Sequence, residues 1–190
     1  MAVVTNLFPE IYPTTWEPDV NDDQLRTRAK NGFVQINTYD AVVQWLAKGA
    51  WETLTGAQRD QIEDHWFTNK RLLYSLFNFW SQKIRGALIG LGNGSTTVFN
   101  LPAKNTSGQT VKVNGTAASP QPTISIGTGP SGLDQATFSS APANGAVLTL
   151  DANAGQQLYD VNYKTVSFPP RHREADVWTC EIEFEQAVGG

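Results

Sequence analysis

Few residues in this chain have the types and spacings that chemistry requires, and the first group is a glycine-rich stretch. Residues 89–102 read IGLGNGSTTVFNLP. A dinucleotide-binding loop needs Gly-x-Gly-x-x-Gly between a strand and a helix, so that helix N-terminal amides face the pyrophosphate. Here Gly94 falls one position early, and residues 96–99 are β-branched or aromatic, which favours a strand. The stretch also lacks the Lys-Ser or Lys-Thr of a P-loop. It therefore predicts a turn between two strands and no phosphate site.

The soft metal ligands are His65, His172 and Cys180, and they do not cluster in the sequence. A zinc site usually takes several ligands at short spacings, and no Cys-x-x-Cys or His-x-x-x-His pair is present. His65 is expected on a helix surface beside Trp66, and His172 in a solvated loop between two arginines. Cys180 alternates with apolar residues, so we expect a buried small hydrophobe and not a nucleophile. The sequence predicts no metal and no cofactor.

A row of three carboxylates, Glu181, Glu183 and Glu185, is the remaining candidate. A strand over residues 178–185 would place these glutamates on one face and the apolar residues between them on the other. A glycosidase holds two carboxylates on opposite sides of a sugar bond, which one strand face does poorly. Like charges roughly 7 Å apart along a strand repel, so the row should meet water or cations from a neighbouring strand or subunit. Because no Gly-x-Ser-x-Gly elbow is present either, we expect that the chain is not an enzyme.

Composition excludes further classes of function. The 190 residues carry a formal net charge of -4 and a pI of about 5.1, whereas a general nucleic-acid binder needs clustered Lys and Arg. The longest apolar run, residues 72–80, is broken by Ser75 and Asn78 and is too short to span a bilayer, and residues 1–13 lack a basic segment before a long apolar run. The single cysteine excludes an internal disulfide. We expect a soluble protein made without secretion.

The composition changes sharply near residue 86 and changes back near residue 158. Between residues 87 and 156 the only charged side chains are Lys104, Lys112, Asp134 and Asp151, and all the tryptophans and tyrosines lie outside this segment. The simplest account is an insert at 87–156 with its own small core, placed in a domain built from residues 1–86 and 157–190.

The insert has the pattern of short strands separated by turn signals. The expected strands are 97–101, 110–113, 123–126, 135–138 and 147–150. Such spacing without a helical period predicts a small β-sandwich or barrel. Disorder is the competing interpretation of so much Gly and Ser, but the alternating apolar residues leave a core to bury.

The outer portion has one clear helical pattern. Thr55 and Gln58 match a capping box, and residues 56–69 then carry Ile62 and Trp66 on one face. Strands are expected on either side, at about 39–47 and at 72–79, and the second of these has so little polar surface that burial on both faces follows. The chain is thus predicted to be mainly β with one main α-helix.

Three of these segments together resemble a known family. They are the strand-helix-strand unit 39–79, the turn GLGNGSTTVFNL at 90–101, and the ending CEIEFEQAV at 180–188. The chain resembles the phage distal tail proteins, including the lambda-type minor tail proteins that form the tail tip or baseplate. The resemblance implies a split β-barrel "belt" domain with one helix, which assembles into a ring, with the insert as an outward-facing β-sandwich. Six copies are usual in such rings.

The resemblance also implies partners and a location. The ring would continue the tail tube and join it to the hub or tip proteins, with the tape measure protein as a further partner, in a virion tail assembled in the bacterial cytoplasm. DNA would pass through the lumen without specific binding, and no membrane insertion is expected. Glu181, Glu183 and Glu185 would face either the lumen or a basic strand of the adjacent subunit. The Pro-rich start, residues 8–18, would be an arm to a neighbour or a surface linker.

Two other classes of function stay open at this point. One is a carbohydrate-binding or receptor-binding module of the tail tip. Sugar platforms use exposed aromatic rings, and the insert offers only Phe99 and Phe138, both expected in the core. The other is a hydrolytic enzyme, for which no constellation of catalytic residues is present.

Overall fold

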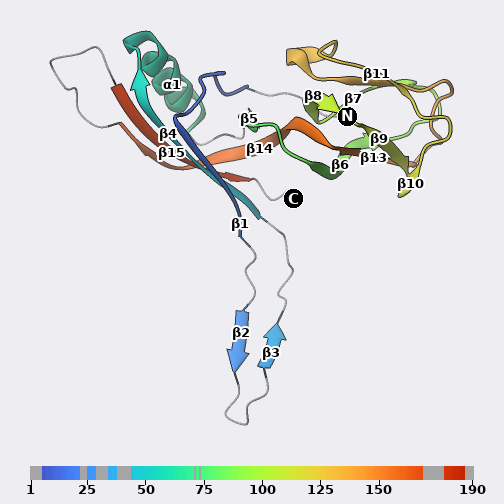
Figure 1. Cartoon of the computed structure of the whole chain (residues 1–190), viewed down its shortest axis with the longest axis horizontal. Coiled ribbons are helices and arrows are strands. Elements are labelled where there is room, and N and C mark those ends of the chain that lie inside the picture. Colours follow the sequence, from blue (N-terminus) through green and yellow to red (C-terminus); the bar gives the residue numbers. More distant parts are fainter. Residues whose placement is uncertain are drawn as a thin grey trace. The chain divides into compact units, whose positions relative to one another are not determined.

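A computed structural model describes residues 6–21, 25–28, 34–37, 44–70, 72, 74–168 and 178–186. Over these ranges the protein is mainly β with one α-helix, as predicted, and its strands form several antiparallel sheets (Figure 1). No sheet in the described part of the chain closes into a barrel.

The chain divides into two compact units. The first, here called the β unit, comprises residues 1–8 and 74–159, and the second, the helix unit, comprises residues 9–73 and 160–190. The limits expected from composition, at 86 and 157, fall within strands β6 (Ile84–Leu91) and β14 (Ala154–Ser167). The division into domains at those two limits stays a prediction.

The helix unit is built on an antiparallel sheet in the order β1–β4–β15–β14. Its strands are β1 (Thr15–Asn21), β4 (Gln44–Leu54), β15 (Trp178–Gln186) and residues 160–167 of β14. A two-stranded ribbon of β2 (Leu25–Arg28) and β3 (Val34–Asn37) lies between β1 and β4 in the sequence (Figure 1). β4 continues to Leu54, well past the strand expected at 39–47, of which residues 39–43 are outside the described ranges.

Helix α1 (Gly56–Asn69) begins where the sequence predicts. The Thr55 hydroxyl accepts from the Gln58 amide at 3.3 Å, and the Gln58 side chain accepts from the Thr55 amide at 3.0 Å, which completes the capping box. Ile62 is fully buried, while Trp66 is half-buried. The helix packs on β4 and β15. It thereby covers one face of the sheet.

The Pro-rich start packs against its own chain. Ile11, Pro13 and Trp16 are buried in the helix unit, and the Trp51 indole N–H donates to the Ile11 carbonyl at 2.8 Å. The expectation of an arm to a neighbour or a surface linker is therefore wrong for these residues, because their apolar side chains find a core within the chain. Pro18 lies in β1, which pairs only with β4 among the described strands, as suits an edge strand.

The β unit contains two small sheets that share one core. One has the order β10–β9–β13–β6, and the other has the order β11–β12–β7. Their bounds are β7 (Val98–Asn100), β9 (Thr110–Val113), β10 (Thr116–Ala117), β11 (Thr123–Ser125), β12 (Gln135–Thr137) and β13 (Val147–Ala152). The shared core includes Ile89, Phe99, Val111, Leu148 and Leu150. The five strands expected in the insert are all present. The prediction that the insert is folded and not disordered is therefore confirmed.

Three further elements complete the β unit. β5 (Tyr74–Phe77) neighbours β14, and β8 (Ala103–Ser107) pairs with the start of β14. A short 3-10 turn, η1, covers Pro130–Gly132. All four residues of β5 are buried, as the sequence predicts, but the strand is shorter than 72–79, and Leu72 is 54% exposed. β8, β10 and β14 were not expected from the sequence.

Candidate functional site

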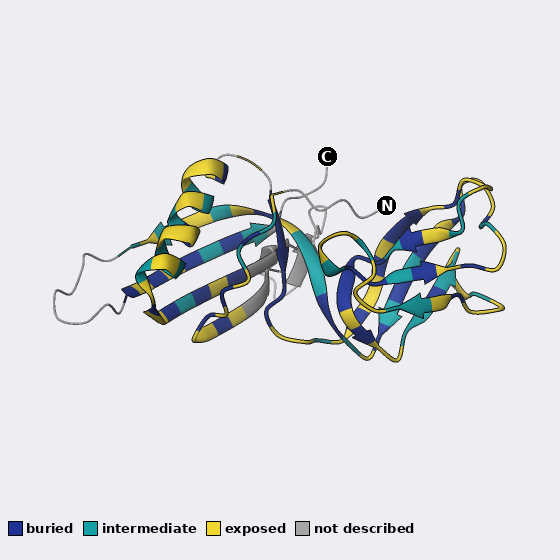
Figure 2. Ribbon diagram, turned by 90° about the horizontal axis from the view of Figure 1, so that it is seen from above, coloured by how far each residue is buried: buried dark blue, intermediate teal, exposed yellow. Residues whose placement is uncertain are grey.

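The predicted glutamate row lies on β15, on the face opposite the core. Residues 178–185 alternate strictly: Ile182 and Phe184 are fully buried, whereas Glu181 is exposed and Glu183 and Glu185 are half-buried. The same alternation of buried and exposed residues is visible along the strands in Figure 2. The predicted strand and its two faces are confirmed.

Neighbouring strands add to this surface, here called the acidic face. Glu183 lies opposite Lys48 on β4 and opposite Thr165 on β14, and Lys48 lies opposite Glu17 on β1. Opposite residues of antiparallel strands point to the same side of a sheet. The acidic face therefore holds Glu17, Lys48, Glu181, Glu183 and Glu185, with carboxylates in excess.

Lys48 partly neutralises the acidic face. It forms an ion pair with Glu181, and the two side chains are 45% and 49% exposed. The hydrogen bond and the charge of Glu181 raise the pKa of Lys48, with smaller contributions from Glu183 and Glu17. An ion pair this exposed adds little to stability. Its effect is to hold one cation among four carboxylates, so these five residues together keep a net negative charge.

The opposite face of the sheet is closed by α1 and aromatic side chains. The Arg59 guanidinium lies 4.2 Å from the ring centroid of Trp178 and 5.8 Å from that of Phe168, and it pairs with Glu63 at 3.3 Å. Trp16 packs on Phe184 with ring centroids 5.7 Å apart. The helix and these rings therefore cover the face of the sheet opposite the acidic face.

His65 lies on helix α1 next to Trp66 in the sequence, and its ring is half-buried. Its Nδ1 atom lies 2.6 Å from the Tyr163 hydroxyl, a partner that the sequence prediction did not include. The two residues are 98 positions apart, so no local pattern could have indicated the pair. His172 lies outside the described residues.

Cys180 is a buried small hydrophobe, as predicted. Its side chain is 2% exposed, and burial raises the pKa of its thiol to about 12. A thiol with so high a pKa supplies almost no thiolate near neutral pH, so it is a poor nucleophile and metal ligand.

The described residues bring together no metal site. No three His, Cys, Asp or Glu side chains gather there in a way that could hold an ion. Nor does any helix in the described ranges have the length and apolar character needed to cross a membrane. The absence of metal, cofactor and catalytic residues stays a prediction.

The glycine-rich stretch forms a turn between strands, as predicted. β6 ends at Leu91 and β7 begins at Val98, and the Asn93 side chain accepts from the backbone amides of Ser95 and Thr96 at 3.0 and 2.7 Å. The turn joins the two sheets of the β unit, since β6 and β7 belong to different sheets. Gly92 permits a close approach: a Cβ atom there would lie 2.3 Å from the Ala143 carbonyl oxygen.

Sequence reasoning missed the role of Asp134. Its carboxylate is fully buried and accepts from the amides of Asn105, Thr106 and Gly127 at 3.2, 2.8 and 2.9 Å, and from the Thr106 hydroxyl at 2.6 Å. A signal was available, because Asp134 is one of four charged residues in a 70-residue segment. With all these bonds made, it is a structural residue that ties strand β8 to the connection that follows β11.

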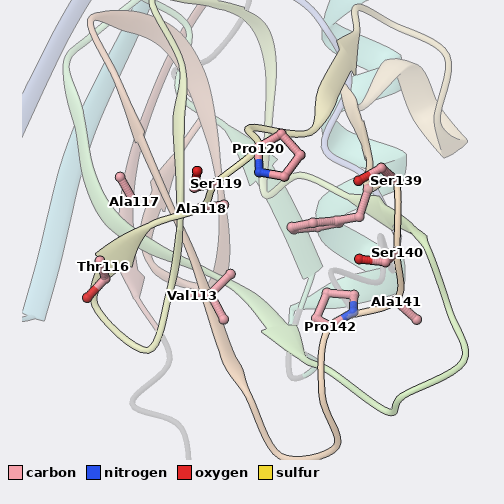
Figure 3. Close-up of a pocket in the computed structure, with 11 residues that line it drawn as sticks. Val113, Thr116, Ala117, Ala118, Ser119, Pro120, Ser139, Ser140, Ala141 and Pro142 are labelled. Carbon is pink, nitrogen blue, oxygen red and sulfur yellow. The ribbon is translucent and has the colours of Figure 1, made fainter.

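The sequence also gave no sign of a pocket in the β unit. The pocket has a volume of about 290 Å³ and lies between the β10–β11 and β12–β13 connections (Figure 3). Pro120 and Ser119 come from the first connection, and Ser139, Ser140 and Pro142 from the second. None of the lining residues is charged.

Comparison with known proteins gives no family for this chain. No family model matches it, and no curated protein matches it.

Proposed function

We propose that this protein is a structural ring component of a bacteriophage tail tip or baseplate, where it continues the tail tube and joins it to the hub or tip proteins. The observation that carries the proposal is the one-sided sheet of the helix unit. One face is closed by α1, and the other presents Glu181, Glu183 and Glu185 with a single ion-paired lysine, Lys48.

In this proposal the helix unit is a split β-barrel belt. The sheet β1–β4–β15–β14 is open in the single chain, and a ring of about six copies would bring such sheets together around a lumen. The β unit would be the outward-facing β-sandwich. Pro18 has no backbone N–H to donate, so it interrupts hydrogen bonding along the free edge of β1. We therefore propose that neighbouring copies contact each other through side chains of the helix unit and not through continuous strand pairing along β1.

The acidic face suits the lining of a lumen through which DNA must pass. A negative surface repels phosphate and so avoids the salt-dependent binding that clustered Lys and Arg produce. If the same face instead met a basic strand of the adjacent subunit, its carboxylates would be neutralised across that contact. In both arrangements the protein acts by assembly and not as an enzyme. Its partners would be the tube protein, the hub or tip proteins and the tape measure protein, in the virion.

The first test is the mass of the purified protein over a range of concentrations, with negative-stain imaging. The proposal expects a ring of about six copies with a central hole, alone or on purified tail tubes. A chain that stays monomeric at every concentration and does not cap tail tubes would contradict it.

Charge reversal then tests the acidic face. The double variant Glu183→Lys/Glu185→Lys is compared with Asp60→Lys/Asp64→Lys, which makes the same change in net charge on exposed helix positions. If the acidic face lines the lumen, the first variant keeps its ring and gains salt-dependent binding of a short DNA duplex. If the face meets the adjacent subunit, the first variant loses the ring. If the two variants form rings and bind DNA equally, the acidic face has neither of these roles.

A second candidate function is a carbohydrate-binding or receptor-binding module of the tail tip. The observation that favours it is the uncharged pocket of the β unit.

A further inference from the structure

The pocket of the β unit combines an apolar floor with a rim of hydroxyl groups. Phe138 lines it and is only 8% exposed, and its ring meets Phe99 edge-on with centroids 5.7 Å apart, so the floor is held by the core. Pro120 and Pro142 add rigid ring faces on two sides (Figure 3). These surfaces suit the C–H groups of a flat, compact ligand.

Four hydroxyl side chains line the same pocket. They belong to Thr116, Ser119, Ser139 and Ser140, and all four residues are exposed. None of these hydroxyls makes a hydrogen bond to another group in the described part of the chain, unlike the hydroxyls of Thr96 and Thr106 elsewhere in the β unit. They are therefore available to donate to and accept from a ligand.

The pocket walls are fixed before any ligand binds. The Gln121 side chain accepts from the Val111 amide at 2.9 Å and donates to the carbonyls of Val111 and Ala118 at 3.0 and 2.8 Å, which holds the first wall. The Gly94 amide donates to the Pro142 carbonyl at 2.9 Å, which holds the second. A preformed site loses less conformational entropy on binding.

Charge and size narrow the class of ligand. No charged residue lines the pocket, so an anionic sugar or a phosphate would find no counter-charge. The volume of about 290 Å³ lies just below the roughly 300–1,000 Å³ of sites for drug-sized ligands, so it suits one small ring. A proline-rich peptide fits less well, because its recognition uses grooves lined with several aromatic rings, and here Phe138 is the only aromatic residue.

We propose that this pocket binds a single neutral hexopyranose unit, with the sugar's apolar face on Pro120 and Pro142 above the buried Phe138 and its hydroxyls on the rim of hydroxyl groups. The inference deepens the second candidate function and does not depend on ring assembly. One shallow site predicts weak binding, which repeated copies on a surface would strengthen.

The test is a titration of the isotopically labelled full chain with D-glucose, D-galactose, D-mannose and N-acetyl-D-glucosamine, each up to about 50 mM, followed by amide NMR. We expect at least one sugar to give saturating shifts at Ser119, Ser139 and Ser140. The double variant Ser139→Ala/Ser140→Ala should bind about tenfold more weakly, because it removes two hydrogen bonds. Ser107→Ala, an exposed serine of β8 outside the pocket, should bind like the wild type.

Three results would overturn the proposal. The first is the absence of saturating shifts at these amides with every sugar. The second is sugar binding that the double variant leaves unchanged. The third is saturation of the pocket by an octaproline peptide and by none of the sugars. The ring measurement is separate, so a failure of assembly and a failure of sugar binding are distinguishable.

Discussion

Replacing Asp134 with alanine is expected to destabilise the β unit strongly. The carboxylate is fully buried and holds three backbone amides and one hydroxyl. Asn105 and Gly127 are exposed, so water can take over their amides, but Thr106 is 5% exposed and cannot be rehydrated in this way. The amide and the hydroxyl of Thr106 would lose their hydrogen-bond acceptor, at a cost of about 1–3 kcal/mol each. The free energy of unfolding should therefore fall by about 2–6 kcal/mol.

Two further variants separate the contributions. Asp134→Asn keeps one acceptor oxygen and should lose less than the alanine variant. Thr106→Val removes only the hydroxyl and leaves the carboxylate with its three amides, so it should cost about 1–2 kcal/mol.

The assay must report on the β unit alone. Five of the six tryptophans belong to the helix unit, so tryptophan fluorescence would follow mainly that part of the chain. Hydrogen–deuterium exchange in increasing urea, read by mass spectrometry on peptides from 97–152, follows the β unit, and peptides from 44–69 serve as the internal reference. If Asp134→Ala unfolds the β unit within about 0.5 kcal/mol of the wild type, the reasoning from buried hydrogen bonds is refuted.

Three other predictions follow from the packing and the charges. Gly49→Ala should destabilise the helix unit by about 1–3 kcal/mol, because a Cβ atom there would lie 2.7 Å from the buried Trp51 ring. In the control variant Gly56→Ala the nearest contact of the new Cβ atom is at 3.7 Å, so this substitution should be neutral or slightly stabilising. The free energies of unfolding of the two variants are compared by urea unfolding followed by tryptophan fluorescence. The hydrogen bond from Lys112 and that from the Gly86 amide lower the pKa of Asp151, so its stabilising effect is complete above the unfolded value of about 3.9 and is lost as the pH falls through the lower folded value. Asp151→Asn should therefore flatten the acid side of the stability profile of the β unit, and an unchanged profile would contradict this. Cys180 should resist iodoacetamide in the native protein at pH 8 and react after unfolding in urea, and rapid native labelling would show that its burial is wrong.

Local patterns in the sequence predicted several elements correctly. The alternation over residues 178–185 gave both faces of β15, and the Thr55 and Gln58 pair gave the start of α1. The run of apolar residues around 74–77 gave a strand buried on both faces. Each of these signals lies within a few residues of the chain, because strand periodicity and helix capping are short-range effects.

Other features depended on which distant segments meet. Nothing near His65 indicates Tyr163, and nothing near Asp134 indicates the amides of residues 105 and 106. The short strands β8 and β10 have too few residues for a period to be visible. The pocket needs two connections that are about twenty residues apart in the sequence but line the same pocket in the fold.

The sequence by itself determined the class of fold, the one helix and the two-faced final strand. Only the tertiary structure decided that the glutamates share their face with Lys48, that the Pro-rich start is buried in its own chain, and that the serine rim encloses a pocket. The physical reason is that periodicity fixes which way a side chain points relative to its own strand, whereas its partner is fixed by non-local strand pairing and by the packing of sheets, helices and loops.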